Sequence, residues 1–256
     1  MEDRIKSRSN PAVKHIKHLA NDRKYRYKHG QFVCEGEKMF FEAASSCAQI
    51  EKIYFCPETC PLSKDELKKC CAEITEADEA VLCAMSDLES AGGLVFVCKM
   101  PHNNHENRPQ NSGWVILDNV QDPGNVGTII RTADAFSMSV AMTQDCADVF
   151  SPKVVRSTMG AIFRANMIVK SKEDIMAHMR AVGIKVYAAA LDKSAADIRE
   201  ISGSRSAVII GNESKGVGEY FLENSDGKVL IPMSGAAQSL NASAAAAICM
   251  WEISGK

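Results

Sequence analysis

The sequence has no long hydrophobic run. Its longest apolar stretch, residues 244–251, has eight residues, whereas a membrane-spanning helix needs about 20. The first ten residues, MEDRIKSRSN, carry charges of both signs and no apolar core, which argues against a secretory signal, and their two early acids argue against a transit peptide. These absences predict a cytosolic protein with no membrane span.

Two further absences limit the chemistry. No pair of cysteines has the C-x2-C spacing of common zinc sites, and neither Cys56-x3-Cys60 nor Cys98-x3-His102 matches a standard zinc pattern. We therefore expect the ten cysteines to be thiols, with a redox or metal role in the first segment left open. His178 is the only histidine beyond residue 113, which makes a Ser-His-Asp hydrolase site a poor interpretation.

The composition is that of a globular protein with room for two domains. Hydrophobic residues make up 46% and charged residues 24% of the 256 positions. The polar stretch 101–113, PHNNHENRPQNSG, separates two segments that differ in their pattern of apolar and polar residues. It is interpreted as a linker. We predict a small α/β domain over residues 1–100, beginning with a basic helix over 11–29, and a second domain over 114–256.

The second segment alternates short apolar runs with helical patterns. Strands are predicted over residues 114–120, 139–144, 165–169, 185–190, 207–211 and 228–232. Near-continuous apolar strands separated by helices indicate a parallel sheet with helices on both faces, and so an α/β fold. Ligands of such sheets bind in loops that follow the carboxyl ends of strands.

The net charge of −2 conceals a basic N-terminus. Up to residue 30, nine lysines and arginines outnumber three acids, a local charge of +6, with Tyr25 and Tyr27 interleaved and Phe32 just beyond. Such a segment suits an RNA backbone with occasional stacking on unpaired bases, although a solvated helix face is the alternative. The candidate RNA-binding residues are Arg8, Lys14, Lys17, Arg23, Lys24 and Arg26.

The first of three unusual loops is DNVQDPGNVGTIIRTADAF, residues 118–136. Pro123, Gly124 and Gly127 predict a tight turn around Asn125, and the helix that follows is expected to carry Arg131 one turn in. A glycine-rich helix start with a nearby arginine is a ready anion site. A plain turn followed by an exposed arginine remains the alternative.

The other two loops follow later strands. GNESKGVG, residues 211–218, has the spacing of neither a Walker loop nor a dinucleotide fingerprint, but places Glu213 at a loop tip. In residues 231–251, Met233 supplies an apolar wall suited to a flat ring, while Ser239 and Asn241 open an alanine-rich helix. Ser239 could also be no more than the N-cap of that helix.

Together the three loops resemble the three motifs of the SpoU (TrmH-like) family of RNA ribose 2′-O-methyltransferases, within the SPOUT superfamily. Residues 151–164, SPKVVRSTMGAIFR, are similar to a family signature between the first two motifs, and the N-terminal segment looks like the L30e-like substrate-binding domain of the ribosomal-RNA branch. Ala242 departs from the valine usual in the family. The resemblance implies a deep trefoil knot from residue 211 onward, a homodimer, S-adenosylmethionine as cofactor and no metal.

The resemblance also implies the functional residues. Catalytic positions would be Asn125, Arg131, Glu213, Ser239 and Asn241, with Glu213 ordering the site around Arg131. Cofactor-binding positions would be Gly211, Asn212, Ile231, Met233 and Leu240. Arg131 would activate the hydroxyl or, since a guanidinium has a pKa above about 12, position a phosphate.

The expected reaction is methyl transfer to a ribose 2′-hydroxyl of large-subunit (23S-type) ribosomal RNA. A transfer-RNA methyltransferase of the same family and a non-catalytic RNA-binding protein are the alternatives.

Overall fold

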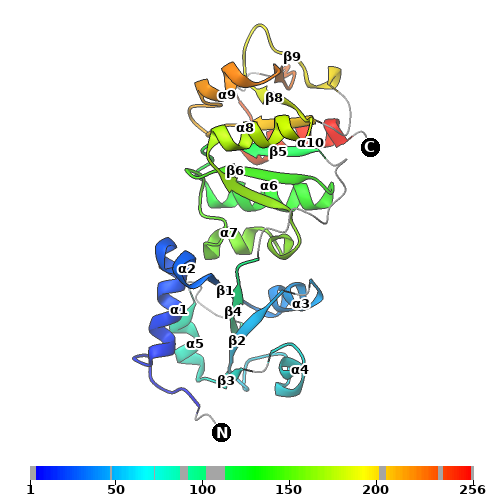
Figure 1. Cartoon of the computed structure of the whole chain (residues 1–256). Helices are drawn as coiled ribbons and strands as arrows, with labels where there is room; N and C mark the ends of the chain where they lie inside the picture. The colour runs from blue at the N-terminus through cyan, green and yellow to red at the C-terminus, as the bar shows by residue number, and fades with distance from the viewer. Residues whose placement is uncertain are drawn as a thin grey trace. The chain divides into compact units, whose positions relative to one another are not determined.

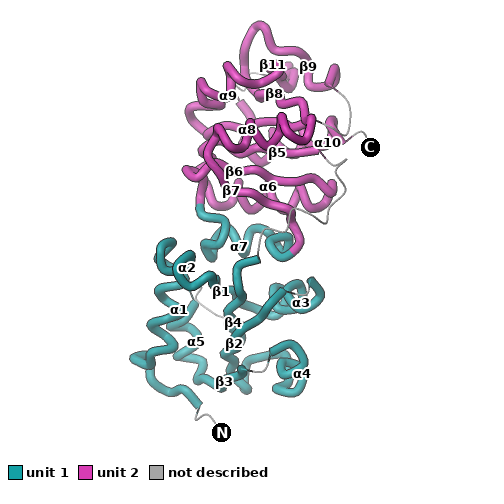
Figure 2. The backbone as a smooth tube through the Cα atoms, viewed as in Figure 1, with its two compact units in different colours: residues 1–102, 148–163 teal, residues 103–147, 164–256 magenta. Residues whose placement is uncertain are grey.

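A computed structural model describes residues 4–46, 48–71, 73–86, 92–101, 113–201, 206–235 and 239–254. The chain forms two compact units, which Figure 2 shows in different colours. Unit 1 comprises residues 1–102 and 148–163, and unit 2 comprises residues 103–147 and 164–256. Unit 1 thus takes in a segment from far along the sequence. Except for its two end residues, the predicted linker 101–113 lies outside the described residues.

Unit 1 is built on a four-stranded sheet in the order β1-β4-β2-β3. Strand β4 runs antiparallel to β1 and β2, whereas β3 runs parallel to β2. The strands are β1 (Gln31–Glu35), β2 (Ile50–Phe55), β3 (Ile74–Glu76) and β4 (Leu94–Lys99). The helices are α1 (Pro11–Asn21), α2 (Arg23–His29), α3 (Glu37–Ser45), α4 (Lys64–Lys68), α5 (Glu79–Met85), α7 (Pro152–Ser157) and the 3-10 turn η2 (Ala161–Phe163).

Helices cover both faces of this sheet. In Figure 1, α1, α2 and α5 lie on one side of it and α3 and α4 on the other. The spacing of Ile16 and Leu19 in α1 turns both side chains inward, where they join Val81 of α5 and Val95 and Val97 of β4 in one buried cluster. The α/β fold predicted for this part of the chain is confirmed.

The single basic helix predicted over residues 11–29 is wrong, because the chain forms two helices. Asn10 caps α1 by accepting a hydrogen bond from the Ala12 amide at 2.8 Å, and Pro11 occupies the first position. At Asp22 the backbone is extended, with φ −119° and ψ 107°. Its carboxylate accepts a hydrogen bond from the Tyr25 amide at 3.1 Å. Asp22 therefore separates the two helices and caps the second.

Unit 2 contains a seven-stranded sheet in the order β7-β6-β5-β10-β8-β11-β9, and every neighbouring pair is parallel. The strands are β5 (Trp114–Leu117), β6 (Ser139–Thr143), β7 (Met167–Lys170), β8 (Lys185–Ala189), β9 (Ala196–Asp197), β10 (Ser206–Ile210) and β11 (Gly227–Leu230). The predicted parallel sheet is confirmed. Strand β9 was not predicted, because a strand of two residues is too short to show an alternation of apolar and polar side chains.

The helices of unit 2 are α6 (Pro123–Ala135), α8 (Lys172–Ala181), α9 (Glu219–Asn224), α10 (Ala242–Ser254) and the 3-10 turn η3 (Ile198–Glu200). Helices α6 and α10 pack against each other and the sheet. Ile175 of α8 and Phe221 of α9 are buried with Ile116 and Ile209 in another cluster. The trefoil knot implied by the resemblance stays a prediction. In the described part of the chain, no helix combines the length and apolar character that crossing a bilayer requires.

Helix α6 begins earlier than predicted. Residues 123–127 form its first turn, not a tight turn before it. Asp122 accepts a hydrogen bond from the Asn125 amide at 2.8 Å, and Pro123 supplies the φ angle of a first helical position. Arg131 therefore lies about two turns into the helix instead of one.

Candidate active site

A cleft with a volume of about 680 Å³ lies in unit 2, where β8, β10 and β11 end and α10 begins. Its size falls within the range of small-molecule sites, about 300–1,000 Å³. Its walls come from the loops that follow these strands and from the first turns of α10. The lining includes all five positions expected to bind cofactor, which are Gly211, Asn212, Ile231, Met233 and Leu240.

One wall of the cleft is a tightly folded loop after β10. Asn212 and Gly216 exchange two backbone hydrogen bonds, 3.0 and 2.9 Å long. This pairing brings the backbone of Gly216 so close to Gly211 that a Cβ there would lie 2.1 Å from the Gly216 carbonyl carbon. The Asn212 amide group also donates to the Asn119 carbonyl at 2.9 Å. The Asn212 side chain thus joins this loop to the one after β5.

Three side chains connect the three loops. The amide nitrogen of Asn125 donates to Glu213 Oε1 at 3.0 Å. The amide oxygen of Asn125 accepts from Asn241 Nδ2, also at 3.0 Å. Glu213 further accepts from the backbone amides of Gln121 and Asp122 at 3.2 and 3.1 Å. Asn125 is buried, so this hydrogen-bonded chain fixes its orientation.

The electrostatic surroundings of Glu213 favour its role as a hydrogen-bond acceptor. Partial burial alone would raise its pKa, but the hydrogen bonds from Asn125, Asp122 and Gln121 outweigh burial and lower it. Glu213 is therefore an anionic acceptor at neutral pH. It orders the start of α6, and among the described residues no hydrogen bond or ion pair joins it to Arg131.

Asn241, not Ser239, caps helix α10. Its side-chain oxygen accepts hydrogen bonds from the backbone amides of Ser243 and Ala244 at 2.9 and 3.3 Å. The interpretation of Ser239 as an N-cap is wrong. Ser239 instead lies exposed along the cleft, where its hydroxyl is available to a ligand.

Arg131 stands apart from this group. It lies on α6, is exposed, and forms no hydrogen bond or ion pair with any residue that the structure describes. It does not line the cleft. The structure thus joins Asn125, Glu213 and Asn241, places Ser239 at the cleft, and leaves the guanidinium of Arg131 open to solvent.

Sequence reasoning missed two carboxylates that shape these loops. Asp122 caps α6, and an acid directly before proline is a signal that could have identified it. Asp118 accepts a hydrogen bond from the Gly218 amide at 2.7 Å and so joins the first loop to the end of the second. Burial raises the pKa of Asp118, against the effect of that hydrogen bond. No sequence signal marks this partnership.

The sequence from residue 113 onward matches a known family. The family model for the SpoU rRNA methylases matches residues 113–251. The chain belongs to the SpoU rRNA methylase family. A second family model, for the MRM3-like substrate-binding domain, matches residues 10–95. The family resemblance stated from the sequence is confirmed.

Relatives of this SpoU-family chain match along its whole length. It is 35% identical over 253 residues to the 23S rRNA (guanosine(2553)-2′-O)-methyltransferase RlmP of Bacillus subtilis, covering 98% of this chain and 99% of that protein. The AdoMet-bound rRNA methyltransferase of Sinorhizobium meliloti superimposes with a TM-score of 0.87 at 27% identity, over 98% of this chain and 96% of that one. The SpoU methyltransferase AviRb of Streptomyces viridochromogenes, solved with AdoMet, gives a TM-score of 0.84 at 26% identity over 95% and 96%.

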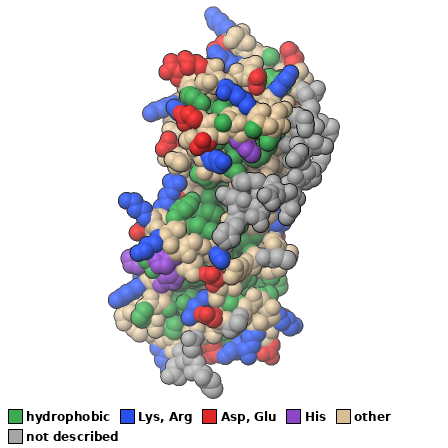
Figure 3. Space-filling view, in the orientation of Figure 1, with side chains coloured by type: hydrophobic (Ala, Val, Ile, Leu, Met, Phe, Trp, Pro, Cys, Tyr) green, Lys and Arg blue, Asp and Glu red, His purple; other side chains and the backbone are tan. Residues whose placement is uncertain are grey.

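Most basic residues expected to bind RNA are exposed on the SpoU-family chain. Lys14 and Lys17 lie on α1, Arg23 and Lys24 lie on α2, and Arg8 precedes α1, where its Nε donates to the Ala80 carbonyl at 3.1 Å. Figure 3 shows Lys, Arg and His side chains gathered over α1 and α2.

The prediction for Arg26 is wrong. Its side chain is buried, with the residue only 3% exposed, and forms an ion pair with Asp148. Its guanidinium also donates to the carbonyls of Leu19 and Ala20 at 2.5 and 2.8 Å. Arg26 is therefore a structural residue of unit 1 and does not reach an RNA phosphate.

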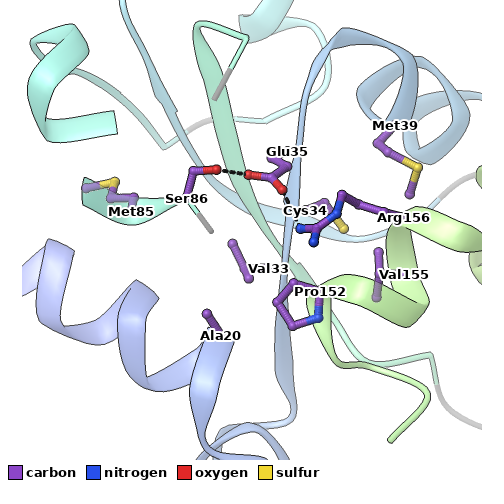
Figure 4. A pocket seen from close by; sticks show the side chains of 10 residues that line it. All are labelled: Ala20, Val33, Cys34, Glu35, Met39, Met85, Ser86, Pro152, Val155 and Arg156. Atoms are coloured by element: carbon purple, nitrogen blue, oxygen red, sulfur yellow. Dashed lines mark hydrogen bonds and ion pairs between the residues drawn. The ribbon is translucent and has the colours of Figure 1, made fainter. Parts of the chain in front are cut away.

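A second hollow, within unit 1, is too small for a ligand. Its volume of about 10 Å³ is at most that of one water molecule. Figure 4 shows Glu35 between Ser86 and Arg156, and the carboxylate accepts a hydrogen bond from each, at 2.6 Å from Arg156. Polar groups thus satisfy one another there, and the cleft of unit 2 is the better candidate site.

The described cysteines are free thiols, and Cys47 lies outside the described residues. Burial, with the neighbouring Cys98, raises the pKa of the Cys34 thiol well above its ordinary value, so Cys34 is a neutral, unreactive group. Among the residues that the structure describes, no three His, Cys, Asp or Glu side chains gather as a metal site. His102, considered above as a ligand, lies outside them.

Proposed function

We propose that this chain transfers a methyl group from S-adenosylmethionine to a ribose 2′-hydroxyl of large-subunit ribosomal RNA. The observation that carries the proposal is the cleft of unit 2, which adjoins the hydrogen-bonded group of Asn125, Glu213 and Asn241. Substrate specificity for ribosomal RNA draws support from the relative of Bacillus subtilis, which shares the full length of this chain. We also propose a cytoplasmic location, which the bacterial relative supports.

The cleft fits S-adenosylmethionine. Ile231, Met233 and Leu240 offer apolar surface for a flat ring, and Gly211, without a side chain, leaves room for the Gly216 backbone that shapes this wall. Two neighbours with TM-scores above 0.8 were solved with AdoMet. When bound, this cofactor supplies an electrophilic methyl group on a sulfonium ion.

The side chains around the cleft then have defined tasks. Asn125, held by Glu213 and Asn241, keeps one amide proton for the RNA ribose. The exposed hydroxyl of Ser239 lies where it can orient the 2′-hydroxyl. A guanidinium is a poor base, so we assign Arg131 to an RNA phosphate, where it positions the ribose without accepting its proton.

The first test measures methyl transfer. The purified protein is incubated with labelled S-adenosylmethionine and, separately, with ribosomal and transfer RNA, and alkali-resistant linkages are mapped because 2′-O-methylation blocks cleavage there. We expect label in ribosomal RNA, and a rate roughly 100-fold lower for Arg131→Ala, the scale of effect that loss of positioning causes.

Arg180→Ala is the matched control, because Arg180 is also exposed in unit 2 but lies on α8. The Arg180→Ala variant should transfer methyl groups at the same rate as the unaltered protein. Label in transfer RNA alone would reassign the substrate. Absence of cofactor binding would refute the methyltransferase function and leave an RNA-binding protein.

We also propose that the protein is a homodimer through α10. Ala244, Ile248 and Trp251 follow one another at helical spacing and are exposed, Ile248 by 39% and Trp251 by 51%. The Trp251 ring also contacts Phe136. An apolar stripe on a water-facing helix marks a protein contact, and the buried side of α10 lines the cofactor cleft through Ala242 and Cys249.

A charged residue in this stripe is expected to break the dimer. Ile248→Glu places a carboxylate in the apolar contact, so sedimentation velocity at micromolar concentration should show a dimer for the unaltered protein and a monomer for the variant. Glu173→Ala, an exposed change on α8, should leave the dimer intact. A monomeric unaltered protein would contradict the proposal.

A further inference from the structure

Four aromatic rings on α1 and α2 form a group that the proposed active site does not use. The His18 ring stacks on the Tyr25 ring with centroids 5.0 Å apart and planes at 29°. The His29 ring lies 4.0 Å from Tyr25 and is tilted by 30°. His15 meets Tyr25 edge-on at 5.6 Å. We call these four residues the His-Tyr stack.

The His-Tyr stack is held in place before any ligand arrives. Asp22 accepts a hydrogen bond from the Tyr25 amide at 3.1 Å, and the Tyr25 hydroxyl bonds to His15 Nδ1 at 2.9 Å. The Tyr25 carbonyl lies 2.9 Å from His29 Nδ1. Because a carbonyl only accepts, His29 Nδ1 carries the proton and its Nε2 is left for another partner. Ordered rings lose little entropy on binding.

The outer rings of the stack face solvent, and cations flank them. His18 and His29 are exposed, whereas His15 and Tyr25 are half-buried. Lys14 lies one turn before His18 on the same face of α1, and neither Lys14 nor the adjacent Lys17 has an ion-pair partner among the described residues. Burial, aided by repulsion from His29, lowers the pKa of His15, so the inner ring is uncharged at neutral pH.

Flat ring faces next to unpaired ammonium groups are how proteins bind single-stranded nucleic acid, since a base stacks on the ring while its phosphates meet the cations. We propose that the His-Tyr stack of unit 1 binds an unpaired base of the RNA substrate, with Lys14 and Lys17 on the adjoining phosphates. This inference rests on the proposed function and adds a base-binding position in unit 1, outside the cleft.

The test uses a short single-stranded oligoribonucleotide that carries one 2-aminopurine, whose fluorescence falls when the base stacks. Full-length His18→Ala and His29→Ala should bind it roughly 5- to 100-fold more weakly than the unaltered protein, as expected for loss of one stacking ring. His18→Phe and His29→Phe keep a flat ring and should retain most of the affinity and the quenching.

Phe41→Ala is the matched control. Phe41 is also an exposed ring of unit 1, but it lies on α3, on the other side of the sheet. Its removal should leave affinity unchanged. Unaltered binding by both alanine variants, or equal losses for the alanine and phenylalanine variants, would overturn the inference. A fall in the unfolding midpoint of an alanine variant without loss of affinity would likewise show that the stack is only structural.

Methyl transfer by the unaltered protein is measured in parallel, so that the two proposals fail separately. Ring-dependent quenching without any methyl transfer would count against the proposed function alone. Methyl transfer that persists while the alanine variants bind RNA normally would count against the His-Tyr stack alone.

Discussion

Replacement of Asp148 by alanine is expected to lower the free energy of unfolding of unit 1 by about 3–5 kcal/mol, the usual cost of leaving a buried charge without its partner. The Asp148 carboxylate accepts hydrogen bonds from Arg26 Nε and Nη2 at 2.9 and 2.5 Å. Both side chains are almost fully buried, 4% and 8% exposed. Without Asp148, the guanidinium would keep only its bonds to the end of α1. Urea unfolding followed by circular dichroism measures the loss.

Asp65→Ala provides the comparison for this result. Asp65 also pairs with a cation in unit 1, Lys68, but at 3.9 Å and with both side chains largely exposed. Exposed pairs contribute little, so we expect a change within about 0.5 kcal/mol. Similar losses for the two variants would show that burial does not control the strength of the Arg26 interaction.

Gly211→Ala is expected to weaken cofactor binding. Its Cβ would lie 2.1 Å from the Gly216 carbonyl carbon and 2.2 Å from the Val217 nitrogen, and these are backbone atoms that cannot turn aside as a flexible side chain could. The steric clash can be removed only if the loop after β10 moves, and that loop forms a wall of the cleft. Strain of roughly 1–3 kcal/mol or more corresponds to affinity for S-adenosylmethionine that is about 5- to 150-fold weaker, which titration calorimetry measures.

Gly235→Ala is the matched control for this experiment. Gly235 follows β11 in the same unit, and a Cβ there would meet no atom of the described residues within 4 Å. The affinity of the Gly235→Ala variant for S-adenosylmethionine should equal that of the unaltered protein. If Gly211→Ala also bound cofactor normally, the tight pairing of Asn212 with Gly216 would not be needed to shape the cleft.

The sequence predicted the sheet of unit 2 well because its strands are short, apolar and separated by helices, as at residues 114–117 and 206–210. It also indicated the three loops as candidate ligand sites, since ligands of parallel sheets bind after the carboxyl ends of strands. It did not predict the start of α6, because Pro123 and Gly124 are as common in turns as in a first helical turn. There the acid at Asp122 was the deciding residue.

Which side chains bond to one another was beyond the sequence. Arg26 looks like its basic neighbours, and its burial depends on Asp148, a residue 122 positions away. Ser239 and Asn241 are both good capping residues, and only the backbone geometry makes Asn241 the cap of α10. Local patterns identified the participating residues, whereas their partners depend on long-range packing.

The inclusion of residues 148–163 in unit 1 limits how this protein can be divided or recombined. A fragment that stopped at residue 101 would lack Phe150, whose ring lies 5.0 Å from that of Phe32, and would lack the carboxylate that neutralises Arg26. A fragment that started at residue 113 would carry Phe150 and Asp148 without the surface that covers them. The two halves of the gene are therefore poor modules for exchange between relatives, and substrate-binding units should be transplanted only together with their 148–163 segment.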